Sequence, residues 1–138
     1  MRYLIKKATV VDENSKYNGK KVDILFNYGV IEEIRSNIEP IKGVKEIQSP
    51  NLHCSISWID IGTQIGEPGL EHRETISSIS AAAKAGGYGA IASFPNTSPV
   101  IQSKSAVQFV MEEARKNNFS IYPIAALSQH NEGKEITE

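Results

Sequence analysis

The chain has 138 residues, of which 40% are hydrophobic and 22% are charged, a balance typical of a folded globular protein and not of a disordered or collagen-like one. Its 15 basic and 16 acidic side chains give a net charge of -1, which provides no positive excess for nucleic acid or for an anionic membrane surface. No stretch approaches the ~18 consecutive apolar residues that a membrane-spanning helix requires. The length is that of one ordinary domain.

The first part of the chain is predicted to consist of short strands. Residues 2–11 form a β-rich run, and the runs 22–26 and 30–34 flank a turn that ends in glycine, a pattern typical of a β-hairpin. One more short strand is expected near 44–47. These features predict a small β unit over residues 1–53, in which no residue carries catalytic chemistry.

From residue 54 the pattern changes to alternating strands and helices. Strands are predicted over 54–61, 88–94 and 120–127, and helices over 71–85 and 103–117. Glu71 and Glu74 fall in the first turn of the earlier helix, where the helix dipole favours carboxylates. The order strand, helix, strand, helix, strand predicts an α/β fold with a parallel sheet and right-handed crossovers. Ligands bind such sheets at the loops that follow the strands, here 62–69, 95–99 and 128–133.

Two of these loops carry sequence motifs. Residues 58–69 read WIDIGTQIGEPG and are followed by RET at 73–75, and residues 94–100 read FPNTSPV. In this order and spacing the chain resembles a dihydroorotase of the amidohydrolase superfamily. The Glu-Pro-Gly turn is shared with allantoinase-like relatives, whereas Arg-Glu-Thr and the Pro-Asn-Thr loop favour dihydroorotase. The resemblance is strongest over residues 59–100.

The resemblance implies a zinc-dependent (β/α)₈ barrel with an accessory β-sandwich, which interconverts carbamoyl-aspartate and dihydroorotate in pyrimidine biosynthesis. Residues 1–53 would then be part of a composite β-sandwich. Residues 54–138 would be the first three strands and two helices of the barrel. Because a complete barrel needs about 250 residues, the resemblance also implies that the chain is a truncated N-terminal portion.

The chain departs from the family where the family places its chemistry. The two positions of the metal-binding histidines hold Gly62 and Gln64, and the position of the substrate-binding arginine holds Gly66. Glycine has no donor and a neutral amide is a poor zinc ligand, so we expect no metal ligand, no catalytic residue and no bound cofactor in this chain, although zinc is the family cofactor. Asn96 is the one substrate-binding residue that the resemblance still supplies.

Other polar residues have simpler structural interpretations. His53 precedes the first barrel strand, His72 follows the first loop, and His130 lies in the third loop, where a solvated side chain is the plain alternative to a ligand. Cys54 cannot form an internal disulfide and sits among apolar residues, which favours a structural thiol. Glu67 is either a general acid or base, or a carboxylate that stabilises the turn before a helix.

Three hypotheses for function follow. The first is a non-catalytic dihydroorotase-like protein that acts as a structural or regulatory partner, in a homo-oligomer or with an aspartate carbamoyltransferase or active dihydroorotase. The second is an active zinc-dependent cyclic amidohydrolase whose ligands lie outside this fragment, and the third is an interaction module that uses its open strand edges. A cytoplasmic location is expected in each case, because the chain has one cysteine and no signal-peptide pattern.

Overall fold

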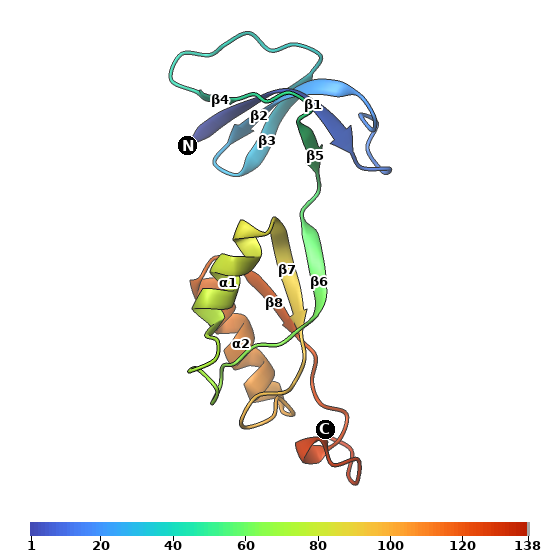
Figure 1. The fold of residues 1–138 in the computed structure, drawn as a ribbon, viewed down its shortest axis with the longest axis vertical. Coiled ribbons are helices and arrows are strands. Elements are labelled where there is room, and N and C mark those ends of the chain that lie inside the picture. The colour runs from blue at the N-terminus through green and yellow to red at the C-terminus, as the bar shows by residue number, and fades with distance from the viewer. Residues whose placement is uncertain (138) are drawn as a thin grey trace. The chain divides into compact units, whose positions relative to one another are not determined.

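The computed structural model describes residues 1–137, and the chain divides into two compact units, Met1–Ile56 and Ser57–Glu138. Each unit has its own sheet and its own apolar core (Figure 1). In the described residues no helix is long and apolar enough to cross a membrane.

The first unit is built on a five-stranded sheet. Its strands are β1 (Arg2–Val11), β2 (Lys21–Asn27), β3 (Val30–Arg35), β4 (Lys45–Ile47) and β5 (His53–Ser55). The order is β3-β2-β1-β4, with β1 to β3 antiparallel as the hairpin pattern predicts. β4 and β5 both run parallel to β1, β4 along residues 3–5 and β5 along residues 9–11. Leu4 and Leu25 pack with Ile38 in one apolar cluster, and Val10 and Ile24 belong to a second one.

A buried carboxylate ties together three segments of this unit. The Asp23 side chain on β2 is fully buried and accepts hydrogen bonds from Lys6 Nζ at 2.6 Å, the Lys7 backbone N–H at 2.8 Å and the Ile38 backbone N–H at 2.9 Å. Lys7 has a positive φ of 53° in the β1 bulge. Asp23 therefore stabilises both an irregular strand and the loop that follows β3. Burial alone raises the pKa of Asp23, but Lys6 and the two N–H groups outweigh it and hold that pKa below its usual value.

The single strand expected over residues 54–61 is wrong, because this segment forms two strands in different sheets. Cys54 pairs with Val10 of the first sheet, whereas β6 (Trp58–Thr63) pairs with β7 (Tyr88–Ser93) of the second. The residues between them, Ile56 and Ser57, belong to neither ladder. A continuous apolar run in the sequence therefore conceals the change of sheet, since hydrophobicity alone does not identify the partner strand.

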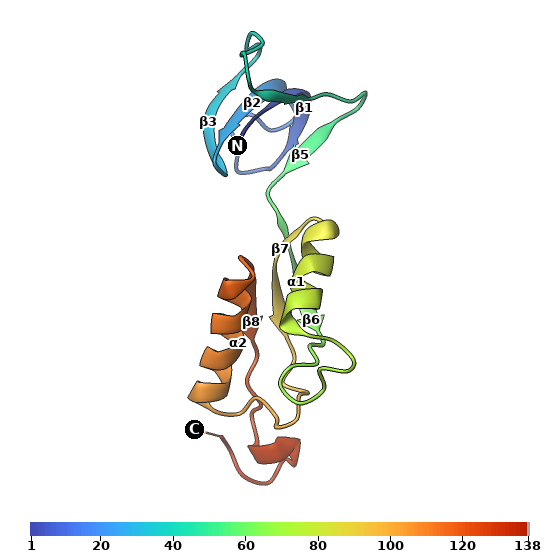
Figure 2. The same cartoon turned by 90° about the vertical axis from the view of Figure 1, so that its left-hand side faces the viewer.

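The second unit has the expected order of strand, helix, strand, helix, strand. Its elements are β6, α1 (Ile76–Ala85), β7, α2 (Lys104–Lys116), β8 (Ser120–Pro123) and a short 3₁₀ turn, η1 (Gln129–Asn131). The sheet order is β6-β7-β8 and both pairs are parallel. α1 and α2 lie side by side on one face of this sheet (Figure 2).

Helix α1 begins at Ile76, five residues later than predicted. The Thr75 side chain accepts from the Ser78 N–H at 3.1 Å and Ser78 Oγ accepts from the Thr75 N–H at 3.0 Å, which is a capping box. The placement of Glu71 and Glu74 in the first helical turn is therefore wrong. Both precede the helix, because Thr75 provides the stronger start signal.

The core of the second unit lies between the helices and the sheet. Ile76, Ile91, Val110 and Ile121 are each at most 2% exposed, and burying each such side chain contributes ~1.5–3 kcal/mol. The last strand is shorter than the predicted 120–127. It ends at Pro123, which has no backbone N–H.

Candidate functional site

The three parallel strands of the second unit bring their following loops to one end of the sheet. The first loop joins β6 to α1, the second joins β7 to α2, and the third follows β8. Gly62, Gln64 and Gly66 lie in or beside the first loop, Asn96 in the second and His130 in the third. The residues singled out by the sequence therefore share this end, apart from His53 and Cys54, which belong to the first unit.

Gly62, at the end of β6, adopts a conformation that other residues rarely take. Its φ is +103°, and a Cβ at this position would lie 3.1 Å from the Phe94 ring. A side chain here would strain the backbone and press on an aromatic neighbour. No donor for a metal comes from this position.

Gly66 lies in a turn that has closed around it. Its carbonyl accepts from the Leu70 N–H at 2.7 Å. A Cβ on Gly66 would lie 2.5 Å from the Leu70 carbonyl oxygen and closer still to that of Glu74. Both neighbours are backbone, so no side chain fits without moving the loop.

Gln64 lies between these glycines and is exposed. Its Oε1 accepts from Arg73 Nη2 at 3.4 Å, a long hydrogen bond. Within residues 1–137 there is no group of three or more His, Cys, Asp or Glu side chains close enough to hold a metal ion. A zinc ion therefore does not fit the residues present at positions 62 and 64, and no chemical step through a metal can be assigned to them.

The Glu-Pro-Gly turn contacts both its own helix and the second loop. Glu67 Oε2 accepts from the Ile76 N–H, the first of α1, at 2.9 Å. The Ser98 N–H donates to the Pro68 carbonyl at 3.1 Å, and Gly69 lies so close to Ser98 that a Cβ on it would overlap the Ser98 carbonyl. Glu67 thus acts as a helix-capping carboxylate, which favours its structural interpretation over a role as acid or base.

Asn96 in the second loop has an unusual environment. Its Oδ1 is buried and has no hydrogen-bond partner among the described residues, as is also true of Ser93 Oγ at the end of β7. An unpaired buried acceptor costs about 1–3 kcal/mol, so Asn96 is the residue of this loop to which a bound donor would add most.

The histidines and the cysteine do not converge. His53 Nδ1 lies 2.7 Å from the Asn51 carbonyl in the first unit, and His72 is exposed before α1. His130 has a φ of 54°, and its backbone N–H, not its ring, donates to Gln102 Oε1 at 2.6 Å. Cys54 is half-buried, and burial raises the pKa of its thiol, as expected of a structural cysteine.

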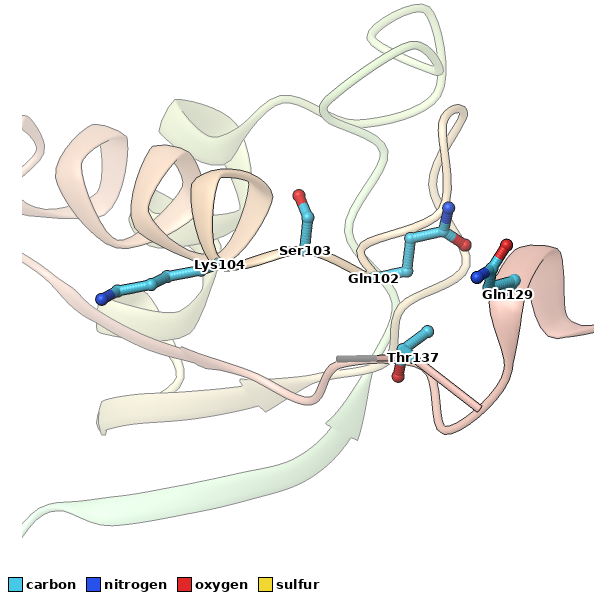
Figure 3. A pocket seen from close by; sticks show the side chains of 5 residues that line it. All are labelled: Gln102, Ser103, Lys104, Gln129 and Thr137. Atoms are coloured by element: carbon cyan, nitrogen blue, oxygen red, sulfur yellow. The ribbon is translucent and has the colours of Figure 1, made fainter. Parts of the chain in front are cut away.

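Two cavities lie in the second unit near these loops. The larger, about 490 Å³, is lined by Gln102, Ser103, Lys104, Gln129 and Thr137 at the start of α2. Figure 3 shows that Lys104 points away from the other four side chains, so the described residues that line this cavity give it polar walls and no converging charge. The smaller, about 190 Å³, is lined by Gln64, Ile65, Gly66, Arg73 and Glu74. Gln64 and Gly66, two of the three positions at which the sequence analysis expects a departure from the dihydroorotase pattern, thus line this cavity.

Solved structures with a similar fold include hydantoinases and a dihydroorotase. The chain superposes on an L-hydantoinase (dihydropyrimidinase) from Arthrobacter aurescens with a TM-score of 0.70 and 16% identity, over 91% of this chain and 28% of that one. It superposes on a dihydroorotase with a TM-score of 0.63 and 14% identity, over 94% of this chain and 32% of that one. At these identities the likeness establishes the fold, which is mixed α/β.

The sequence relatives are more specific. The chain is 34% identical over 139 residues to a dihydroorotase of Thermoanaerobacter sp. (strain X514) and 35% identical over 140 residues to one of Caldanaerobacter subterraneus subsp. tengcongensis, in each case over 100% of this chain and 32% of the relative. No family model matches. The resemblance to dihydroorotases is therefore confirmed along the whole chain. The chain spans about a third of the length of these relatives.

Proposed function

We propose that the chain is the N-terminal portion of a dihydroorotase-like protein of pyrimidine biosynthesis that has kept the scaffold and lost the metal chemistry. The observation that carries this proposal is the closed turn at Gly66 together with the positive φ of Gly62. At positions 62 and 66, where the resemblance places functional side chains, the backbone has conformations or close contacts that suit glycine. The proposed location is the cytoplasm.

In this proposal the second unit is the first part of a (β/α)₈ barrel, and the first unit is part of a composite β-sandwich. The parallel order β6-β7-β8 and its two crossover helices support the barrel. The outer strands are open, and apolar side chains on them are exposed, with Ile59 58%, Ile61 77% and Tyr122 54% accessible. Further parallel strands beside β6 and β8 would cover these side chains.

The role that remains for such a scaffold is structural or regulatory. We propose that it associates with itself, or with an aspartate carbamoyltransferase or an active dihydroorotase. Asn96 is the proposed ligand contact, since its buried Oδ1 has no partner. Dihydroorotate carries ring N–H groups that could donate to it.

The test combines metal content, turnover and association. The purified protein is expected to contain far less than one zinc per chain after exposure to zinc and desalting, and to show no interconversion of carbamoyl-aspartate and dihydroorotate. Sedimentation velocity with each candidate partner should then show a larger complex. An Asn96→Ala variant should weaken any binding of dihydroorotate without altering the association.

The alternative is an active zinc-dependent amidohydrolase with its ligands elsewhere in a longer protein, and the names of the relatives favour it. Stoichiometric zinc together with turnover would establish that alternative and refute the non-catalytic role.

A further inference from the structure

Arg73 lines the cavity beside Gly66, and its positive charge is not paired with a nearby carboxylate in the described residues. Arg73 lies in the loop before α1, and among residues 1–137 it makes no ion pair with a carboxylate within 4.0 Å. Within the same residues, the Arg73 side chain makes one hydrogen bond, the long one to the neutral amide of Gln64. A guanidinium carries five N–H donors in a fixed fork, and Arg73 is exposed, so most of its donors are open to solvent or to a ligand.

The carboxylates around Arg73 already have their own donors. Glu67 accepts from the Ile76 N–H, Glu71 accepts from the Gly69 N–H at 2.7 Å, and Glu74 accepts from Ser78 Oγ. The Gly69 N–H holds the pKa of Glu71 below its usual value. Although Arg73 follows one glutamate and precedes another within a few residues, none of the three neutralises it.

The loop that faces Arg73 also has unused backbone donors. In the described part of the chain, the backbone N–H groups of Gln64, Ile65 and Gly66 donate no hydrogen bond. Ile65 is 2% exposed and Gly66 is buried. Buried N–H groups nearly always have a partner, and successive free N–H groups are a recurrent feature of anion sites.

We propose that this cavity binds a small carboxylate, held by the Arg73 guanidinium, the Gln64 amide and the free N–H groups of the loop. A monoanion fits better than a phosphate dianion, because the Glu74 carboxylate lines the same cavity and repels a second negative charge. The volume of about 190 Å³ is below the roughly 300–1,000 Å³ of drug-sized sites, so the ligand has few heavy atoms beyond its carboxylate.

The proposal of a carboxylate site does not depend on the proposed non-catalytic role. A protein that fails to bind a carboxylate here could still be a structural partner. Conversely, a carboxylate in this cavity neither requires nor excludes turnover, so each proposal can fail alone.

The test is a titration with sodium acetate, followed by two-dimensional ¹H–¹⁵N NMR at constant ionic strength set with chloride. The expected result is a saturable shift of the backbone amide signals of Gln64, Ile65 and Gly66. Arg73→Gln should weaken acetate binding about tenfold or more, as expected for a lost charge-assisted pair. Arg73→Lys should give an intermediate affinity, because lysine keeps the charge without the fork.

The matched control is Arg115→Gln, which removes the same charge from the last turn of α2. Its affinity for acetate should equal that of the unmodified protein, and the unchanged signals of β7 and β8 would show that each variant is folded. An acetate affinity of Arg73→Gln equal to that of the parent would overturn the proposal. Equal weakening by both arginine variants, shifts that never saturate, or tighter binding of phosphate than of acetate would also overturn it.

Discussion

The closed turn at Gly66 can be tested by adding one methyl group. In Gly66→Ala the new Cβ would lie 2.5 Å from the Leu70 carbonyl oxygen and nearer to that of Glu74. Because both obstacles are backbone, the turn must open, and the Leu70 N–H to Gly66 carbonyl bond of 2.7 Å is lost or lengthened with it. Alanine adds only a Cβ atom, which every larger side chain also has. If alanine does not fit at position 66, an arginine does not fit there either.

The expected cost follows from these two effects. Overpacking a site costs about 1–3 kcal/mol, and a lost hydrogen bond costs about 1 kcal/mol. Gly66→Ala should therefore lower the free energy of unfolding by about 2–4 kcal/mol. Gly87→Ala is the control, because Gly87 has a φ of +84° but nothing within 4 Å of an added Cβ. It should lose only the ~1–2 kcal/mol associated with the left-handed conformation.

Urea unfolding followed by Trp58 fluorescence measures both values, since Trp58 is the only tryptophan and lies on β6 of the unit that contains both glycines. The midpoint of Gly66→Ala should fall below that of Gly87→Ala at equal slope. If Gly66→Ala costs less than Gly87→Ala, the turn has room for a side chain, and the main support for the non-catalytic proposal fails.

Two further predictions concern the buried carboxylate of Asp23 and positions 62 and 64, where the resemblance places histidines. Asp23→Ala should destabilise the first unit by about 3–5 kcal/mol, because it removes the carboxylate paired with the largely buried Lys6 ammonium and leaves the Lys7 and Ile38 N–H groups without their acceptor; far-UV circular dichroism measures this loss. Since the pKa of Asp23 in the folded protein lies below the usual value of an aspartate, about 3.9, its contribution to stability is present above about pH 4 and disappears as the pH falls through the pKa of the folded state. Asp23→Ala should lack this acid dependence, and an unchanged profile would contradict the assignment. Gly62→His with Gln64→His should bind zinc no better than Gln64→His alone in equilibrium dialysis, since φ +103° and the Phe94 ring oppose a side chain at position 62; one tightly bound zinc per chain would contradict this.

The sequence predicted the elements of the fold better than their ends. The parallel order of β6, β7 and β8 follows from alternating strands and helices, which are local patterns. The start of α1 was misplaced because Glu71 suits a first turn, whereas the reciprocal bonds of Thr75 and Ser78 determine where the helix begins. The division between Ile56 and Ser57 could not be predicted, because strand partners are chosen by contacts distant in the sequence.

The unusual glycines of the candidate site could be identified from the sequence, but the contacts around them could not. Gly62 and Gly66 were identified by comparison with the motif, but the closing of the turn depends on where Leu70 and Glu74 place their carbonyl groups. Arg73 was missed as a site residue for a similar reason. In the sequence Arg73 is only part of the Arg-Glu-Thr motif between two glutamates, and the structure is needed to show that the nearby carboxylates bind other donors.

The Glu-Pro-Gly residues that this chain shares with the motif hold the loops together. Glu67 caps α1, Pro68 accepts from Ser98, and Gly69 lets the two loops meet. These contacts involve backbone atoms and remain useful whatever chemistry the loops support. Gly62 and Gly66 have geometries that oppose a side chain, at Gly62 through its φ of +103° and at Gly66 through close packing against backbone atoms. If the proposed loss of metal chemistry is right, similarity to dihydroorotases persists along the chain because these backbone contacts of the scaffold are kept, whatever happens at positions 62, 64 and 66.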